Sequence, residues 1–222
     1  MEYYDLHVDI ENIEGAINMA KKIGFNGIAL TTQILEKKPE INIDLVSCIM
    51  IKARNKDELK REIEKNRERF EILMVYGGEY EINRAACEDS KVDLLCHPEK
   101  NRNDSGLDHV CVKAAAENNV AIEINFNEVL NARNRPKILS FLQRNIFLCK
   151  KYNTKVVTTS GAKSIWEIRA PRELAALTYL LGLDLKSAID SISIIPKDIV
   201  DINREKLSGL RFGNVRVVKE NR

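Results

Sequence analysis

Several patterns that would point to familiar functions are missing from this sequence of 222 residues. No apolar run approaches the roughly 18 residues that a membrane-spanning helix needs. The N-terminus lacks the basic and apolar regions of a signal peptide. No GxGxxG or GxxxxGK(S/T) loop follows any predicted strand, which argues against the common nucleotide-binding loops. We therefore expect a soluble, cytoplasmic protein.

Cysteine and histidine are also scarce in the arrangements that would indicate a reactive or metal-binding site. The five cysteines include no CxxC pair, and Cys48, Cys96 and Cys149 lie in apolar runs. This pattern predicts buried free thiols in a reducing compartment, without a zinc site built on cysteine. The three histidines leave no obvious base for Ser160 or for a cysteine, so a catalytic triad is not indicated.

The overall charge of the chain says little about its partners. Lys and Arg number 35 against 33 Asp and Glu, which gives a net charge of +2, and 44% of the residues are hydrophobic. This composition suits one globular domain with a full core. Only local clusters of basic residues can therefore indicate binding to nucleic acid.

Short β-rich segments alternate with longer segments of helical periodicity. The predicted strands span residues 3–8, 27–30, 45–51, 72–75, 92–96, 121–125 and 155–158. The predicted helices span 13–23, 56–69, 107–118, 137–152, 171–181, 185–193 and 196–207. This alternation predicts an α/β fold of the (β/α) TIM-barrel type, with about seven strands and extra C-terminal helices. An open, doubly wound sheet is the alternative.

Residues at the predicted helix ends agree with this fold. Gly24 suits the position just after the first helix, and Asp184 suits the N-cap before Leu185. We expect residues 1–208 to form a single barrel domain. Residues 209–222 form a tail with a basic balance, which either frays or pairs as an edge strand through residues 215–218.

Polar residues close to the ends of the predicted strands would gather at one end of such a barrel. Asp5, His7 and Asp9 alternate along the first strand, so their side chains should share one face. Oxygen and nitrogen ligands that converge in this way can hold a divalent metal. The other strands contribute Glu79, His97, Glu123, Asn125 and the stretch Ser160-Gly161-Ala162-Lys163. We expect Glu123 and Asn125 to satisfy polar groups inside the barrel mouth.

This layout resembles the polymerase-and-histidinol-phosphatase superfamily of metal-dependent phosphoesterases. His7, Glu79 and His97 match that pattern, but Gly161 and Lys163 stand where its last motif has Asp and His. A lysine ammonium has no acceptor and repels a cation. The resemblance therefore implies a related barrel with no metal and no cofactor. The remnant of its ligand set would be Asp5, His7, Glu79 and His97.

A closer resemblance covers most of the chain. The stretch DLLCHPEKNRNDSGLDHVCVKAAAENNVAIEIN, from Asp93 to Asn125, resembles the central segment of the family of archaeal ribonuclease P protein component 3. That family includes a eukaryotic thirty-kilodalton subunit. VVTTSGAKSIWEIRAPRELAAL, from Val156 to Leu177, is similar to its other long motif, and Asn83-Arg84-Ala85-Ala86 to a third, shorter one.

The resemblance implies a protein subunit of the ribonucleoprotein that removes the 5′ leader of precursor tRNA. Such a subunit binds the catalytic RNA domain together with component 2, as a heterodimer or heterotetramer, and supports its fold and activity. It works beside other ribonuclease P proteins and meets precursor tRNA through the holoenzyme. Catalysis would lie in the RNA, so no catalytic residue is expected in this chain. The alternative is a metal-dependent phosphoesterase that uses Asp5, His7, Glu79 and His97.

RNA binding of this kind relies largely on Lys and Arg side chains that meet phosphates. The resemblance implies RNA contact at five positions: Arg84, Arg102, Lys113, Arg169 and Arg172. The competing interpretation is that these side chains are solvated or ion-paired. Trp166, the single tryptophan, can stack on a base, although we expect it to anchor its loop to the barrel.

Overall fold

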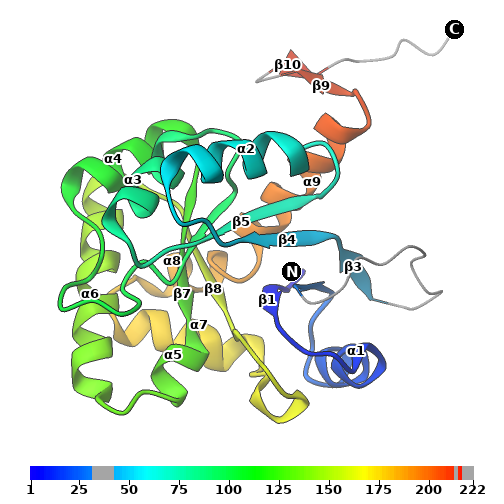
Figure 1. The fold of residues 1–222 in the computed structure, drawn as a ribbon. Helices are drawn as coiled ribbons and strands as arrows, with labels where there is room; N and C mark the ends of the chain where they lie inside the picture. Colours follow the sequence, from blue (N-terminus) through cyan, green and yellow to red (C-terminus); the bar gives the residue numbers. More distant parts are fainter. Residues whose placement is uncertain (32–42, 213–214, 217–222) are drawn as a thin grey trace, which may run out of the picture.

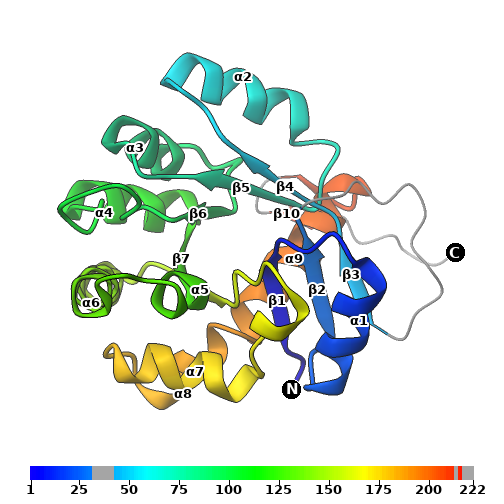
Figure 2. The same ribbon diagram turned by 60° about the horizontal axis from the view of Figure 1, so that its bottom comes forward.

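The computed structural model describes residues 1–31, 43–212 and 215–216. Parallel strands form its centre, in two sections (Figures 1 and 2). The first section has the order β1 (Tyr4–Val8), β2 (Gly27–Leu30), β3 (Asp44–Val46). The second has the order β4 (Cys48–Ile51), β5 (Ile72–Tyr76), β6 (Leu94–Cys96), β7 (Ala121–Asn125), β8 (Val156–Thr159).

Two junctions close these sections into a barrel. Val8 forms a parallel bridge with Ala162, just beyond β8, and the backbone N–H of Asp9 donates to the carbonyl of Ala162 over 2.7 Å. At the other junction, β3 and β4 are consecutive along the chain and are separated only by Ser47. The barrel therefore has seven strand positions, and the predicted fold class is confirmed.

The predicted single strand at 45–51 is broken at Ser47. Its backbone N–H and its hydroxyl both donate to Glu71 Oε2, over 2.6 and 3.0 Å. This side-chain bond replaces a ladder bond at that residue. The chain pairs with β2 before Ser47 and with β5 after it. A change of partner within one apolar run leaves no mark in the periodicity, so the sequence did not predict it.

Helices surround the strands (Figure 2). They are α1 (Ile13–Lys22), α2 (Lys56–Asn66), α3 (Tyr80–Glu88), α4 (His109–Asn118), α5 (Phe126–Leu130), α6 (Arg135–Tyr152), α7 (Pro171–Leu180), α8 (Leu185–Asp190) and α9 (Ile194–Leu207). The helices α3 and α5 were not predicted, because both are short and follow their strands almost directly. Asn125 ends β7 and also caps α5 through its side-chain oxygen.

The core has two layers. Large side chains such as Leu6, Met74 and Leu94 fill the barrel interior, together with Ile199 and Val200 of α9. The second, larger layer lies between the strands and the surrounding helices. Because α9 packs under the interior, one end of the barrel is covered and the opposite, carboxyl end of the strands stays accessible.

The helix-end predictions are confirmed. Gly24 follows α1 with a φ of 100°, in the left-handed region that favours glycine, and Asp184 Oδ1 accepts from the N–H of Ser187 over 2.9 Å. In the tail, β9 (Arg211–Phe212) and β10 (Val215–Arg216) form an antiparallel hairpin. Val215 and Arg216 thus pair within the tail, while residues 217–218 of the predicted edge strand lie outside the described residues. The domain boundary at 208 stays a prediction.

The prediction of buried free thiols is confirmed. All five cysteines are free and buried. Among the described residues, no helix is both long and apolar enough to cross a bilayer.

Candidate functional site

A buried carboxylate lies at the centre of the accessible barrel end. Glu123 of β7 is 1% exposed. Its Oε1 lies 2.6 Å from His7 Nδ1 and accepts from Thr159 Oγ1 over 2.6 Å and from Asn125 Nδ2 over 3.2 Å. Its other oxygen, Oε2, has no hydrogen-bond partner among the described residues. Glu123 and Asn125 therefore satisfy polar groups in the mouth, as predicted.

The neighbours of Glu123 keep it ionised. Burial opposes ionisation, but the charge and hydrogen bond of His7, the charge of His97 and the hydroxyl of Thr159 lower the pKa of Glu123 to about 2. A carboxylate held in this way accepts hydrogen bonds and does not pick up a proton near neutral pH.

Asp5 and His7 of β1 and Asp9, which follows the strand, do not form one cluster. Asp5 accepts from the N–H of Ser160 over 3.1 Å, His7 meets Glu123, and Asp9 accepts from the hydroxyl of Thr31 over 3.1 Å. The register of β1 shifts between Asp5 and Val8, which breaks the strict alternation. The expectation of a shared face is therefore wrong for Asp5, which is fully buried away from solvent. His7 and Asp9 both line one cavity at this end of the barrel.

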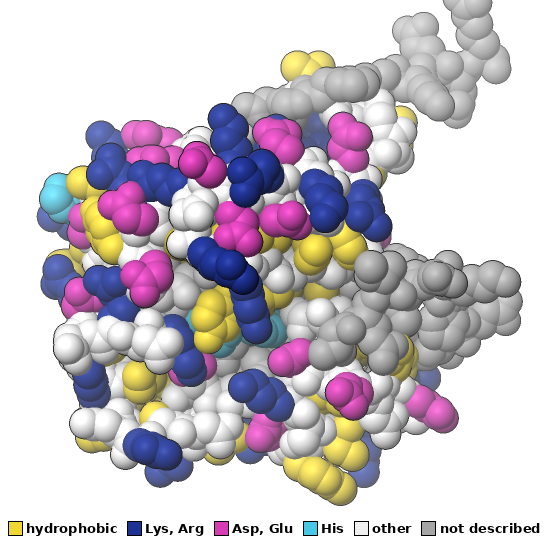
Figure 3. Space-filling model, viewed as in Figure 1, with side chains coloured by type: hydrophobic (Ala, Val, Ile, Leu, Met, Phe, Trp, Pro, Cys, Tyr) yellow, Lys and Arg dark blue, Asp and Glu magenta, His cyan; other side chains and the backbone are white. Residues whose placement is uncertain are grey.

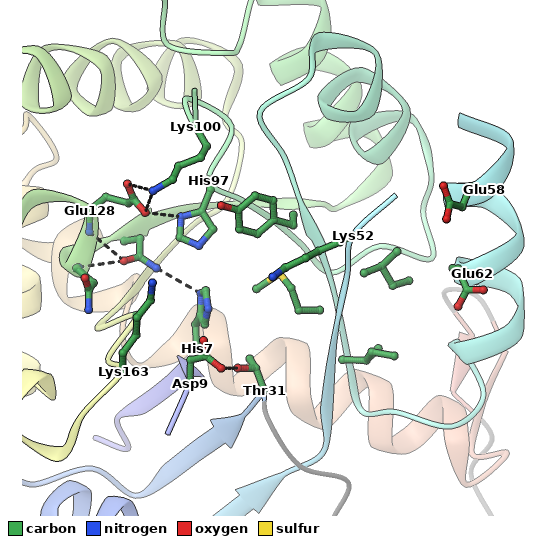
Figure 4. Close-up of a pocket in the computed structure, with 17 residues that line it drawn as sticks. His7, Asp9, Thr31, Lys52, Glu58, Glu62, His97, Lys100, Glu128 and Lys163 are labelled. Carbon is green, nitrogen blue, oxygen red and sulfur yellow. Dashed lines mark hydrogen bonds and ion pairs between the residues drawn. The ribbon is translucent and has the colours of Figure 1, made fainter. Parts of the chain in front are cut away.

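His97 continues the network to α5. Its backbone has a φ of 52°, its Nδ1 lies 3.3 Å from Glu128 Oε1, and its Nε2 lies 4.0 Å from Glu123 Oε2. Lys100 Nζ lies 2.8 Å from the same Glu128 oxygen (Figure 4). Although burial opposes it, His97 and Lys100 lower the pKa of Glu128 to about 2. The carboxylates Glu123 and Glu128 raise the pKa of His97 against the effect of its burial.

A cavity of about 630 Å³ lies over this network. Lys52 and Lys163 line it from opposite sides (Figure 4). Lys52 Nζ lies 5.1 Å from the centre of the Tyr76 ring. Within the described ranges, neither lysine has an acidic partner. The mouth of the barrel therefore presents two ammonium groups that are not in ion pairs, and the carboxylates Asp9, Glu58 and Glu62 line the same cavity.

Two groups of side chains are close enough to hold a metal: His7, Cys96 and Glu123, and His97, Glu99 and Glu128. Part of each group is already engaged, since His7 contacts Glu123 and Lys100 contacts Glu128. Among the described residues, Glu123 Oε2 and Glu99 Oε2 have no hydrogen-bond partner. Lys52 and Lys163 add positive charge at the same cavity, which disfavours a cation. The two lysines and the Lys100–Glu128 pair therefore oppose a cation, while the unpartnered carboxylate oxygens favour one.

The structure does not assemble the predicted remnant of a ligand set. His7 and His97 lie together, with ring centres 5.3 Å apart. Glu79 is exposed at the N-cap of α3 and does not line the cavity, and Asp5 is held behind the mouth. Glu123, which the metal hypothesis had not included, stands next to His7 instead.

The five basic positions implied by the resemblance do not line the cavity. They differ in whether their side chains form ion pairs. Arg84 pairs with Glu88 over 2.8 Å, Arg102 with Asp104 over 2.6 Å, and Lys113 with Glu117 over 3.8 Å. Arg169 precedes α7, donates to the carbonyl of Trp166 and lies 5.5 Å from the Phe126 ring centre. Arg172, in the first turn of α7, is exposed.

Trp166 does not anchor its loop, so that expectation is wrong. Its side chain is 75% exposed in a short 3-10 turn, Ile165–Glu167. Glu167 fastens the loop instead, because its Oε2 accepts from Asn127 Nδ2 over 2.7 Å and from the N–H of Lys163 over 2.8 Å. The indole is thus free to contact a partner.

Sequence reasoning missed Lys52, Asn127 and Glu128 as residues of the mouth. Lys52 directly follows β4, and the other two lie within three residues of the end of β7. The rule that singled out His97 would have found them, because loops after parallel strands meet at the same barrel end.

Comparison with known proteins identifies relatives along nearly the whole chain. Residues 2–208 match the family described as RNase P subunit p30. Ribonuclease P protein component 3 of Methanosarcina barkeri is 34% identical over 233 aligned positions, which cover 99% of this chain and 97% of that protein. The protein of the same name from Methanococcus maripaludis is 39% identical over 182 positions, 75% of this chain and 78% of that protein.

Solved structures support the same grouping. A chain in a cryo-EM structure of archaeal ribonuclease P with mature tRNA superimposes with a TM-score of 0.80 and 28% identity, and the match covers 97% of this chain and all of that chain. A Xaa-Pro dipeptidase superimposes with a TM-score of 0.63 at 10% identity, over 91% of this chain and 76% of that chain. This second likeness concerns the fold alone.

Proposed function

Because the chain belongs to the RNase P subunit p30 family, we propose that it acts as a protein subunit of ribonuclease P, the ribonucleoprotein that removes the 5′ leader of precursor tRNA. The observation that carries this proposal is the fit of nearly the whole chain, with a TM-score of 0.80, to a chain of an archaeal ribonuclease P structure that contains mature tRNA. The subunit supports the fold and activity of the catalytic RNA.

Two carboxylates at the centre of the barrel mouth are poorly suited to catalysis. A general base must be able to accept a proton near the working pH. Glu123 and Glu128 have a pKa of about 2 and are bound to His7, His97 and Lys100. Glu123 and Glu128 are therefore unsuited to act as a general base, and the proposal assigns cleavage to the RNA because of the family to which the chain belongs.

The five basic side chains remain our proposal for RNA contact: Arg84, Arg102, Lys113, Arg169 and Arg172. Exposed ion pairs such as Arg84 with Glu88 contribute about 0–1 kcal/mol, so a phosphate can replace the carboxylate without a large loss. Arg172 is exposed at the start of α7. Within the proposal, the chain binds component 2 as a heterodimer or a heterotetramer, in the cytoplasm.

Reconstitution of precursor-tRNA cleavage tests this function. The reaction combines the catalytic RNA with component 2 and this chain, at a magnesium concentration where the RNA alone is slow. We expect cleavage to need the RNA, to be raised by the two proteins together, and to be absent with the proteins alone. Cleavage by this chain without RNA, or no effect of the chain on the RNA, would contradict the proposal.

Assays of RNA cleavage and of phosphatase turnover with histidine variants distinguish this function from that of a metal-dependent phosphoesterase. If the barrel mouth performed metal chemistry, His7→Ala and His97→Ala would abolish phosphatase turnover and remove a stoichiometric metal. We expect instead that folded His7→Ala supports RNA cleavage close to the wild-type level. Metal analysis of the purified protein gives a second readout that does not depend on activity.

A further inference from the structure

A second hollow of about 430 Å³ adjoins the barrel mouth. It lies between the loop after β6, the helix α5 with the loop that follows it, and the start of α6. We call it the asparagine groove; among the residues that line it are Asn101, Asn127, Arg133, Lys137, Phe141 and Lys163. Lys100, Asn127, Glu128 and Lys163 also line the cavity of the mouth, so the two hollows are continuous.

The asparagine groove carries uncompensated positive charge. Among the residues that the structure describes, the exposed Arg133 and Lys163 have no acidic partner. Lys137 Nζ donates to the neutral Asn103 Oδ1 over 3.0 Å. Two acidic residues line the groove: Glu128 is paired with Lys100, and Glu99 is buried. The surface around α5 and α6 is mostly white and dark blue in Figure 3, with little magenta. Three cationic side chains are thus available to an anionic ligand.

Neutral amides and one aromatic ring complete the lining. The exposed Asn131 donates to Asn127, and the exposed Asn101 has a φ of 59°, which places it on a tight turn. Asparagine amides offer both donors and acceptors, which match the edges of nucleobases. Phe141 of α6 is partly exposed, and Lys137 Nζ lies 5.4 Å from its ring centre. An aromatic face beside a cation suits a base stacked next to its own phosphate.

We propose that the asparagine groove binds a single-stranded stretch of RNA. Arg133, Lys137 and Lys163 contact successive phosphates, and an unstacked base lies on Phe141 while the asparagines meet base edges. A paired A-form helix hides its bases, whereas loops and bulges expose them to aromatic and amide side chains. The inference rests on the proposed function and names a surface separate from the five basic positions above, apart from Arg102 at the groove wall.

Fluorescence anisotropy of the full chain with a labelled single-stranded RNA of about 12 nucleotides tests the groove, and the same sequence as a duplex serves as the comparison. Arg133→Ala and Lys163→Ala should each weaken binding and lower the salt slope by about 0.7. Phe141→Leu should weaken binding about tenfold without changing the slope.

Matched controls lie on the same protein. Lys186→Ala removes a cation that pairs with Asp190 on α8, and Phe147→Leu changes an exposed phenylalanine on the same helix as Phe141. Both should bind as the wild type does. Equal effects of groove and control variants would overturn the inference, as would equally tight, Phe141-independent binding of the duplex. Tighter, groove-dependent binding of a polyglutamate peptide would overturn it in favour of an acidic protein partner.

The same variants in reconstituted cleavage separate this inference from the proposed function. If the wild-type chain supports cleavage and the groove variants bind RNA normally, the groove assignment alone is wrong. If the wild-type chain does nothing for the RNA, the proposed function is wrong, whatever the groove binds. Thermal melting of each variant confirms that it is folded, because Arg133, Lys163 and Phe141 are at least partly exposed.

Discussion

The two ends of the barrel differ in whether their basic side chains form ion pairs. At the end covered by α9, Arg67 pairs with Asp93 over 2.6 Å, and Arg204 binds both Asp44 and Glu71 over 2.7 to 2.8 Å. At the carboxyl end, Lys52 and Lys163 form no ion pair within the described part of the chain, although Asp9, Glu58 and Glu62 line the same cavity.

The difference separates stability from function. At the covered end the arginines form ion pairs with carboxylates. The pairs of Arg204 connect α9 to the strands, so they contribute to the stability of the fold. The open end keeps charge that the fold does not use. The open end also contains buried acidic side chains whose ionised form is disfavoured, because burial raises the pKa of Asp5 to about 6 and that of Glu99 to about 7. Residues that a fold leaves unsatisfied are the ones to test for binding.

The largest expected effect is at the covered end. Asp93 accepts from Arg67, from the N–H of Leu73 over 2.7 Å and from Asn203 Nδ2 over 2.8 Å, and it is 8% exposed. Asp93→Ala leaves a largely buried guanidinium without its counter-ion, so the free energy of unfolding should fall by about 3 kcal/mol. Urea denaturation measures this. Glu88→Ala, which breaks an exposed pair, is the control and should lose less than about 1 kcal/mol.

A smaller effect, with a pH dependence, is expected at the open end. Glu99 is 3% exposed and its Oε2 has no hydrogen-bond partner. Since burial raises the pKa of its folded form to about 7, the unfolded chain releases this proton at lower pH than the folded chain. The wild type should therefore lose stability as the pH rises from the ordinary glutamate range through about 7.

Glu99→Gln removes this dependence. Relative to the wild type, the variant should gain about 2 kcal/mol in the free energy of unfolding between about pH 5 and pH 8. Denaturation in urea at both pH values gives the result. Parallel pH curves for the two proteins would show that the carboxyl of Glu99 titrates normally.

The smallest effect on stability is expected for the free lysines. Lys52→Ala and Lys163→Ala remove exposed charges that form no ion pair in the described part of the chain, so the free energy of unfolding should change by less than about 0.5 kcal/mol. The same denaturation experiment applies. A loss comparable to that of Asp93→Ala would mean that these lysines hold the fold, and that the contrast between the two ends is false.

Sequence patterns predicted the barrel well because its signals are local. Apolar strand runs, the glycine after α1 and the N-cap at Asp184 each need only neighbouring residues, and the structure confirms them. The barrel mouth was harder. The shift of register inside β1 separates the partners of Asp5, His7 and Asp9, and the break at Ser47 depends on Glu71 from another strand. Periodicity carries no record of such long-range bonds.

The candidate site shows the same limit. The ends of strands pointed to His7, His97 and Glu123, but only the fold shows that Glu79 lies elsewhere and that Trp166 is exposed. The asparagine groove combines the loop after β6, the region after β7 and the loop after β8. Its residues are ordinary surface types in sequence, and their chemistry appears only when three loops are brought together.

Lysine footprinting tests the central claim, that the open end of the barrel is the RNA-binding end, most directly. The full chain is acylated with and without the ribonuclease P RNA, and each lysine is quantified by mass spectrometry. We predict that Lys52, Lys137 and Lys163 lose most of their reactivity on binding RNA, while Lys91, Lys155 and Lys206 near the covered end keep theirs. Protection of the second group with the first group unchanged would contradict the account.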